Sequence, residues 1–80
     1  MTAVRLDAVV WEGVDEETEA LLESWKVSEG ATVSEGDLLA VAVLVKTSID
    51  VPAPASGVLR RILVAEDATF GRDQDLAIIE

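Results

Sequence analysis

The sequence contains two similar short segments: residues 28–33 read Ser-Glu-Gly-Ala-Thr-Val, and residues 65–70 read Ala-Glu-Asp-Ala-Thr-Phe. The second copy lies 37 residues after the first (65 − 28). The same shift places residues 39–41 on residues 76–78. It also aligns the apolar residues before the turn, placing Leu21, Trp25 and Val27 on Val58, Ile62 and Val64. The chain therefore contains two copies of one strand–turn–strand unit.

Two copies predict the two halves of one domain. Solenoid proteins need about three or more repeats, whereas two units can bury their apolar faces against each other. Valine and isoleucine are abundant and the apolar spacing is mostly two, which favours strands. At 80 residues, the chain has room for a single domain, residues 1–80. We therefore expect an all-β domain with two small sheets around one core.

Five apolar segments are expected as strands: residues 4–11, 20–27, 38–51, 58–64 and 76–79. The local pattern alone predicts one continuous strand over residues 38–51, because no Gly, Asn or Asp marks a turn between Leu38 and Ile49. Simple alternation predicts Leu21, Trp25 and Val27 on one face of their strand. The opposite face is then expected to carry Leu22, Ser24 and Lys26.

The acidic segment 12–19 is expected to be an exposed loop. A helix over residues 14–25 is the alternative, because Glu, Ala and Leu recur there at roughly helical spacing. No capping residue ends such a helix, and residues 25–27 are typical of a strand. Trp11 and Trp25 are expected to make core or hydrophobic contacts.

Composition excludes several functions. The chain has no cysteine and no histidine, so disulfides, thiolate nucleophiles and imidazole bases are absent. A formal net charge of −10 disfavours binding to nucleic acid and to anionic membranes. The longest apolar run, residues 38–45, is far shorter than the roughly 20 residues that span a bilayer. Because the N-terminus also lacks a signal-peptide pattern, we expect a cytoplasmic protein with no membrane partner.

The sequence shows no combination of residues that is typical of a catalytic site. Serines and threonines have no nearby base, and the glycines do not follow a phosphate-loop spacing. A metal site would need closely converging acidic oxygens, for which the candidates are Asp15, Glu16, Glu17 and Glu19. That run is more typical of a solvated loop. We therefore expect neither a metal site nor an enzyme.

The chain resembles the biotinyl/lipoyl-carrier family. The resemblance lies in residues 25–30, Val33, residues 36–40, Lys46, residues 51–59, residues 62–64 and residues 76–78. In this family the modified lysine follows a Gly-Asp-x-Leu-Ala stretch by one strand and precedes a Pro-Ala-Pro-x-x-Gly-like stretch by a few residues. Lys46 meets both conditions. The resemblance implies a flattened barrel, or barrel-sandwich hybrid, of two antiparallel four-stranded sheets with internal two-fold pseudosymmetry. It places Lys46 at a hairpin tip, opposite the chain termini.

Within the family, the chain resembles a lipoyl domain of the 2-oxo-acid dehydrogenase acyltransferase type. The resemblance implies lipoic acid covalently attached to Lys46. The sequence departs from the common Glu-Thr-Asp-Lys-Ala, since residues 43–47 read Val-Leu-Val-Lys-Thr. Biotinyl domains usually carry methionines where this chain has Val45 and Thr47, so biotin is the alternative. An unmodified module for protein interaction is a third interpretation, favoured by the apolar, acid-free turn.

The resemblance also implies a role and partners. A lysine amine on a flexible stem can form an amide with lipoic acid, while the redox and acyl-transfer chemistry belongs to the cofactor. Lys46 would then carry a swinging arm, and Lys26 is the chain's other lysine. The implied partners are a lipoate ligase and the dehydrogenase, acyltransferase and dihydrolipoamide dehydrogenase components of a 2-oxo-acid dehydrogenase complex. In lipoyl domains the loop after the first strand helps partner enzymes to recognise the domain, and by position this loop is segment 12–19. We expect a monomeric domain. Met1 and the absence of a Pro/Ala-rich linker after Glu80 favour a free-standing protein over a segment of a multidomain chain.

Overall fold

The computed structural model describes residues 1–15, 17–72 and 74–80, and its elements are almost all strands. The strands are β1 Thr2–Val4, β2 Ala20–Trp25, β3 Thr32–Val33, β4 Leu38–Leu44, β5 Thr47–Pro52, β6 Gly57–Ile62, β7 Thr69–Phe70 and β8 Ala77–Ile79. One 3-10 helix, η1 Ala8–Trp11, follows β1. The predicted all-β class is confirmed, and the helix considered for residues 14–25 is wrong, because β2 occupies the second half of that segment.

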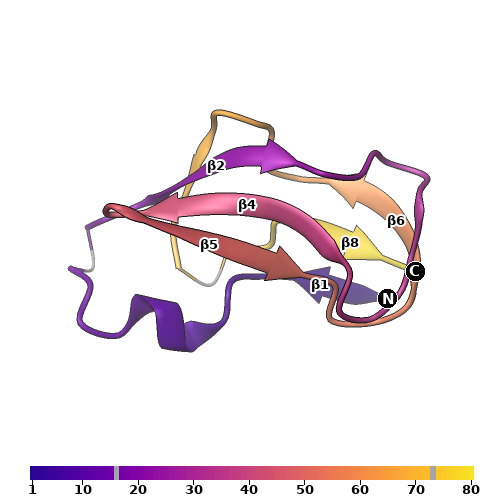
Figure 1. Cartoon of the computed structure of the whole chain (residues 1–80), viewed down its shortest axis with the longest axis horizontal. Helices are drawn as coiled ribbons and strands as arrows, with labels where there is room; N and C mark the ends of the chain where they lie inside the picture. Colours follow the sequence, from indigo (N-terminus) through magenta and orange to yellow (C-terminus); the bar gives the residue numbers. More distant parts are fainter. Residues whose placement is uncertain (16, 73) are drawn as a thin grey trace.

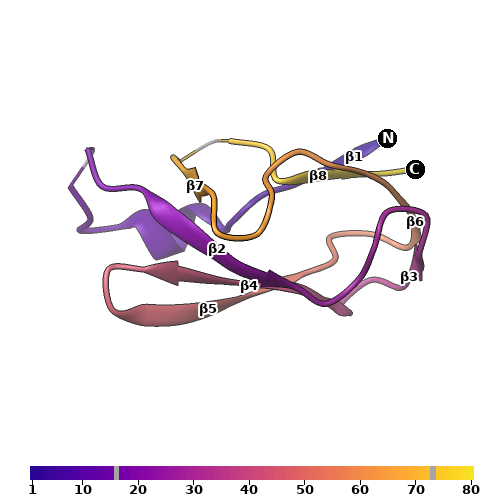
Figure 2. The same cartoon turned by 90° about the horizontal axis from the view of Figure 1, so that it is seen from above.

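The strands form two antiparallel four-stranded sheets, in the orders β1-β8-β6-β3 and β5-β4-β2-β7. Figure 2 shows the sheets as two layers with the chain crossing repeatedly between them. Exchanging β1–β4 for β5–β8 converts one strand order into the other. The predicted flattened barrel with two-fold pseudosymmetry is therefore confirmed, with the two sheets left open rather than closed on each other.

Backbone hydrogen bonds repeat with the shift of 37 residues that the sequence shows. The Gly30 N–H donates to the Leu59 carbonyl at 2.7 Å, and the Asp67 N–H donates to the Leu22 carbonyl at the same distance. Gly30 and Asp67 both have positive φ, 91° and 69°, a conformation that Gly and Asp tolerate better than most residues. The two turns are therefore copies in structure as well as in sequence, and each donates to the strand of the other half.

A β-bulge in each half corrects the predicted strand faces. The pairing register changes between Leu22 and Ser24 in β2. It changes at the equivalent position in β6, between Leu59 and Arg61. One extra residue on the bulged strand breaks the two-residue alternation. As a result, Leu22 and Leu59 are both fully buried, with 0% of their surface exposed. The prediction that Leu22 shares the outer face with Ser24 is wrong.

The first predicted strand, residues 4–11, is also too long. β1 ends at Val4, and residues 5–7 separate it from η1. The Asp7 carboxylate accepts a hydrogen bond from the Val9 N–H at 3.1 Å, a capping contact that satisfies one of the unpaired donors at a helix start. η1 ends at Trp11, whose ring packs edge-on against Phe70 at 6.3 Å between centroids. Trp11 therefore reaches the core from a helical turn, and Val10 packs partly buried against the core.

Both sheets contribute to one core. The largest fully buried side chains are Phe70, Leu22, Leu39, Leu59, Leu76, Ile79, Val4 and Val51. Trp11 is 5% exposed and Trp25 packs half-buried against the core, as predicted for both. Within the described residues, no helix is long and apolar enough to cross a membrane.

The pseudosymmetry determines what lies at each end of the molecule. The symmetry relates β8 and β1 to β4 and β5, so the chain termini correspond to the turn between β4 and β5. Figure 1 shows the N- and C-termini together at one end and the β4–β5 turn at the other. The hairpin turn and the chain termini therefore lie at opposite ends of the molecule.

Candidate functional site

Lys46 lies at the tip of the β4–β5 hairpin. The last strand pair joins Leu44 to Thr47, so Val45 and Lys46 form a two-residue loop. From Ala40 to Leu44, buried and half-buried side chains alternate along β4. Leu44 is buried and directly precedes the loop, so the core anchors the hairpin as far as the loop itself. The expectation that a hairpin replaces one continuous strand over residues 38–51 is confirmed.

The base of the hairpin explains why the family spacing leads to Lys46. The Gly36 N–H donates to the Ala53 carbonyl at 2.9 Å, and the Ala53 N–H donates to the Asp37 carbonyl at 2.8 Å. The glycine-containing stretch and the Pro-Ala-Pro stretch therefore face each other at the opposite end from the loop. The β4–β5 pairing continues from Leu38–Pro52 to Leu44–Thr47, with one register shift between Leu38 and Ala40, and ends at the loop that carries Lys46.

Val45 adopts an unfavourable backbone conformation in the loop. Its φ is 62°, a left-handed value that is a clear outlier for a β-branched residue. A positive φ at the first loop position alone is the sign pattern of a type II′ hairpin turn, where glycine is preferred. The strand pairing therefore imposes a conformation that the local sequence does not favour.

The Lys46 side chain is exposed. In the described part of the chain the ion pairs are Arg5 with Asp75 and Arg60 with Glu80, and neither involves Lys46. Lys26 differs in its setting: it directly follows β2, and its backbone N–H donates to the Leu39 carbonyl at 2.7 Å. It therefore lies one residue beyond the strand in which it was predicted. Of the two lysines, Lys46 alone occupies a hairpin loop.

An apolar groove adjoins Lys46, and we call it the tip groove. Its volume is about 280 Å³, and its lining residues are Val10, Val14, Leu44, Val45, Thr47 and Ile49. The groove lies between the hairpin and the segment that contains η1. Sequence reasoning missed it, because its walls are distant in the sequence. The signal that the sequence offered was the presence of Val10 and Val14 in and next to the acidic segment 12–19.

Arg72 holds one wall of the tip groove in place. Its guanidinium donates to the Val14 carbonyl at 2.8 Å and lies 5.5 Å from the centre of the Trp11 ring. A cation over an indole face is attracted to the ring. The segment between β1 and β2 is thereby tied to the residues that follow β7.

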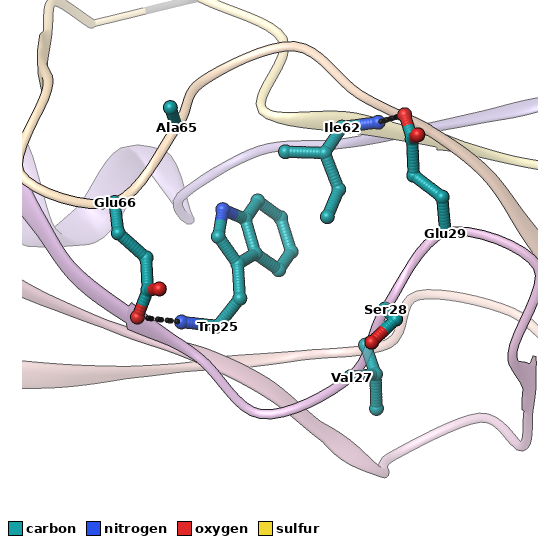
Figure 3. Close-up of a pocket in the computed structure, with 7 residues that line it drawn as sticks. All are labelled: Trp25, Val27, Ser28, Glu29, Ile62, Ala65 and Glu66. Carbon is teal, nitrogen blue, oxygen red and sulfur yellow. Dashed lines mark hydrogen bonds between the residues drawn. The ribbon is translucent and has the colours of Figure 1, made fainter.

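A larger cavity, of about 620 Å³, lies where the two halves meet. Its lining residues are Trp25, Val27, Ser28, Glu29, Ile62, Ala65 and Glu66. Figure 3 shows the Trp25 ring between the two carboxylates. Several lining residues are repeat equivalents, so the cavity follows from the pseudosymmetry. Neither lysine lines it.

The acidic candidates of segment 12–19 lie on the surface. Asp15, Glu17 and Glu19 are exposed, and Glu16 lies outside the described residues. The Asp15 carboxylate accepts from the Glu17 N–H at 3.0 Å, which is a local turn contact. Across residues 1–15, 17–72 and 74–80, no group of acidic side chains is arranged to hold a metal ion. The segment remains a candidate contact surface for a partner.

Comparison with known proteins adds one match to this geometry. A sequence model of the biotin/lipoyl attachment family, described as "Biotin-requiring enzyme", matches residues 12–79. The match extends over most of the chain and includes the β4–β5 hairpin. No curated protein matches the chain.

Proposed function

The chain belongs to the biotin/lipoyl attachment family, and we propose that it is a lipoyl carrier whose cofactor is attached to Lys46. Domains of this family are carriers rather than catalysts, and they hold biotin or lipoic acid covalently on a lysine. The observation that carries the proposal is the place of Lys46 in the two-residue loop of the β4–β5 hairpin.

The residues around Lys46 fit such an attachment. An exposed amine on a four-carbon stem is accessible to a ligase, and the paired strands below it place the loop at one end of the molecule (Figure 1). Attachment forms an amide between Nζ and the carboxyl carbon, while the amine loses a proton and the activated carboxyl loses its leaving group. When bound, the lipoyl group would supply a disulfide that accepts an acyl group and two electrons.

The surroundings of Lys46 support lipoic acid over biotin. The flanking residues are Val45 and Thr47, whereas biotinyl domains usually carry methionines there. The adjoining tip groove is lined mostly by aliphatic side chains, which suit a hydrocarbon chain and a dithiolane ring. The ureido ring of biotin has N–H and C=O groups that an aliphatic lining leaves without partners.

The proposal includes partners of the kind that a lipoyl carrier serves. These are a lipoate ligase and the dehydrogenase, acyltransferase and dihydrolipoamide dehydrogenase components of a 2-oxo-acid dehydrogenase complex. The exposed acidic residues of segment 12–19 lie at the Lys46 end of the molecule, because Val14 of that segment lines the tip groove with Val45. They are therefore available to basic partner surfaces near the arm.

An unmodified interaction module is the second candidate function. One observation favours it: Val45, beside Lys46, is 67% exposed, and an exposed apolar residue at a hairpin tip is a typical protein contact. This candidate assigns no role to the amine of Lys46.

The test is in vitro modification of the purified chain with a lipoate ligase and, separately, with a biotin ligase, followed by intact mass. We expect the lipoyl mass increment with the first enzyme and an unchanged mass with the second. Lys46→Arg should abolish the increment, and the matched control Lys26→Arg should retain it. A biotinyl increment, or a lipoyl increment that persists in Lys46→Arg, contradicts the proposal.

A further inference from the structure

We propose that the tip groove is a resting site for the lipoyl arm, so that the arm alternates between a docked and an extended position. This inference rests on the proposed function, because it requires a lipoyl group on Lys46. The ligand class of the site is a short saturated acyl chain ending in a small apolar ring. The occupant is part of the modified chain itself.

The attachment point favours this occupant. Val45 and Thr47, the two chain neighbours of Lys46, both line the groove, so the arm originates at the groove's edge. Docking is therefore intramolecular, and a short flexible tether gives the attached group a millimolar effective concentration. A weak apolar contact suffices to populate a docked state under these conditions.

The chemistry of the lining also matches. Five of the six lining residues are valine, leucine or isoleucine, and Thr47 is uncharged. This absence of charge in the lining contrasts with a formal net charge of −10 for the whole chain. The volume of about 280 Å³ is close to the lower limit for small-molecule pockets. Burial of apolar surface on both sides would drive docking.

The groove also lies where the two-fold pseudosymmetry fails. Residues 5–19 join β1 to β2, whereas only residues 53–56 join the equivalent strands β5 and β6. The longer connection contains Val10 and Val14, which form one wall of the groove. The chain therefore has extra residues at the end of the molecule that bears Lys46, and these residues create the apolar wall.

Methyl nuclear magnetic resonance of the enzymatically lipoylated protein, compared with the unmodified protein, tests this inference. Intact mass is measured first, and a missing lipoyl increment contradicts the proposed function and this inference with it. For the modified protein, we expect shift changes at the methyl groups of Val10, Val14 and Ile49, and nuclear Overhauser contacts from the arm to them. Changes confined to Val45, Lys46 and Thr47 overturn the docking inference and leave the carrier proposal intact.

Rates of dithiolane reduction by a water-soluble phosphine provide the second measurement. Docking shields the ring, so Val10→Ser should raise the rate, by up to roughly tenfold if one buried valine is lost from the contact. Val9→Ser is the matched control, because Val9 is 57% exposed and does not line the groove.

A second pair of variants avoids the core altogether. Thr47→Asp places a charge in the lining from an exposed strand position, and Ser48→Asp places one next to it outside the lining. Of this second pair, we expect only Thr47→Asp to be reduced faster than the parent protein. Equal rates in all four variants and the parent protein overturn the inference, because a docked arm cannot be insensitive to its site.

Discussion

Glu29 and Glu66 occupy equivalent positions in the two halves, and each accepts a hydrogen bond from the backbone of the other half. The Ile62 N–H donates to Glu29 Oε2 at 2.8 Å, and the Trp25 N–H donates to Glu66 Oε2 at 3.2 Å. Figure 3 shows both contacts. Ile62 and Trp25 are themselves repeat equivalents. The two carboxylates therefore act as a reciprocal pair of clasps that join the halves beside the pseudo-two-fold axis.

The reciprocal contacts predict similar costs for losing either clasp. We expect Glu29→Ala and Glu66→Ala each to lower the free energy of unfolding by about 0.5 to 1 kcal/mol, the lower part of the usual range for one hydrogen bond, because both bonds are exposed. Urea denaturation measures the effect. Glu35→Ala is the control, because the described structure gives the Glu35 side chain no hydrogen bond. A clasp variant as stable as this control contradicts the assigned role.

Close packing at Gly57 predicts a larger cost. A Cβ added there would lie 2.6 Å from the Glu80 carbonyl oxygen and 2.9 Å from the Ile79 Cγ2. We expect Gly57→Ala to lower the free energy of unfolding by about 2 kcal/mol, because β6 must move away from the end of the chain. Gly71→Ala is the matched control, since nothing lies within 4 Å of its added Cβ. Equal melting temperatures for the two variants would show that Gly57 does not lie as close to Ile79 and Glu80 as the structure places it.

Relief of the strained loop predicts a stabilising substitution. Val45→Asn should raise the free energy of unfolding by about 1 kcal/mol, because asparagine tolerates the positive φ that valine resists. Thr47→Asn, at a strand position next to the loop, should give no such gain. Thermal unfolding of both variants distinguishes them, and a destabilised Val45→Asn would mean that the apolar contact of Val45 outweighs the strain.

Loss of the Arg72 contacts predicts a local as well as a global change. Arg72→Ala should lower the free energy of unfolding by about 1 kcal/mol, because it removes a cation–π contact and a hydrogen bond. Hydrogen exchange should speed up around residues 8–14 in particular. Arg61→Ala serves as the control, since Arg61 is an exposed strand residue. Unchanged exchange in that segment would show that Arg72 does not anchor it.

The repeat made the fold predictable, because equivalent segments in two halves must pack in equivalent ways. Residues 20–25 shifted by 37 coincide with β6, and residues 32–33 shifted likewise coincide with β7. Strand faces were less predictable. A bulge at Glu23 or Arg60 adds one residue to a strand without changing its composition, so alternation assigned Leu22 to the wrong side.

The position of Lys46 was predictable only through the family resemblance. No turn-forming residue marks the loop at Val45, so the local sequence does not show where β4 ends and β5 begins. The tip groove depends on contacts between residues 10–14 and residues 44–49, which local pattern cannot join. The 3-10 helix had one local signal, the capping carboxylate of Asp7.

The most direct test of the carrier role of Lys46 is the intact mass of the protein purified from its native host, with the modified residue located by peptide fragmentation. We expect a lipoyl increment on Lys46 and none on Lys26. A bare mass, if it persists after treatment with a lipoate ligase and a biotin ligase, would contradict the carrier role and favour the unmodified interaction module.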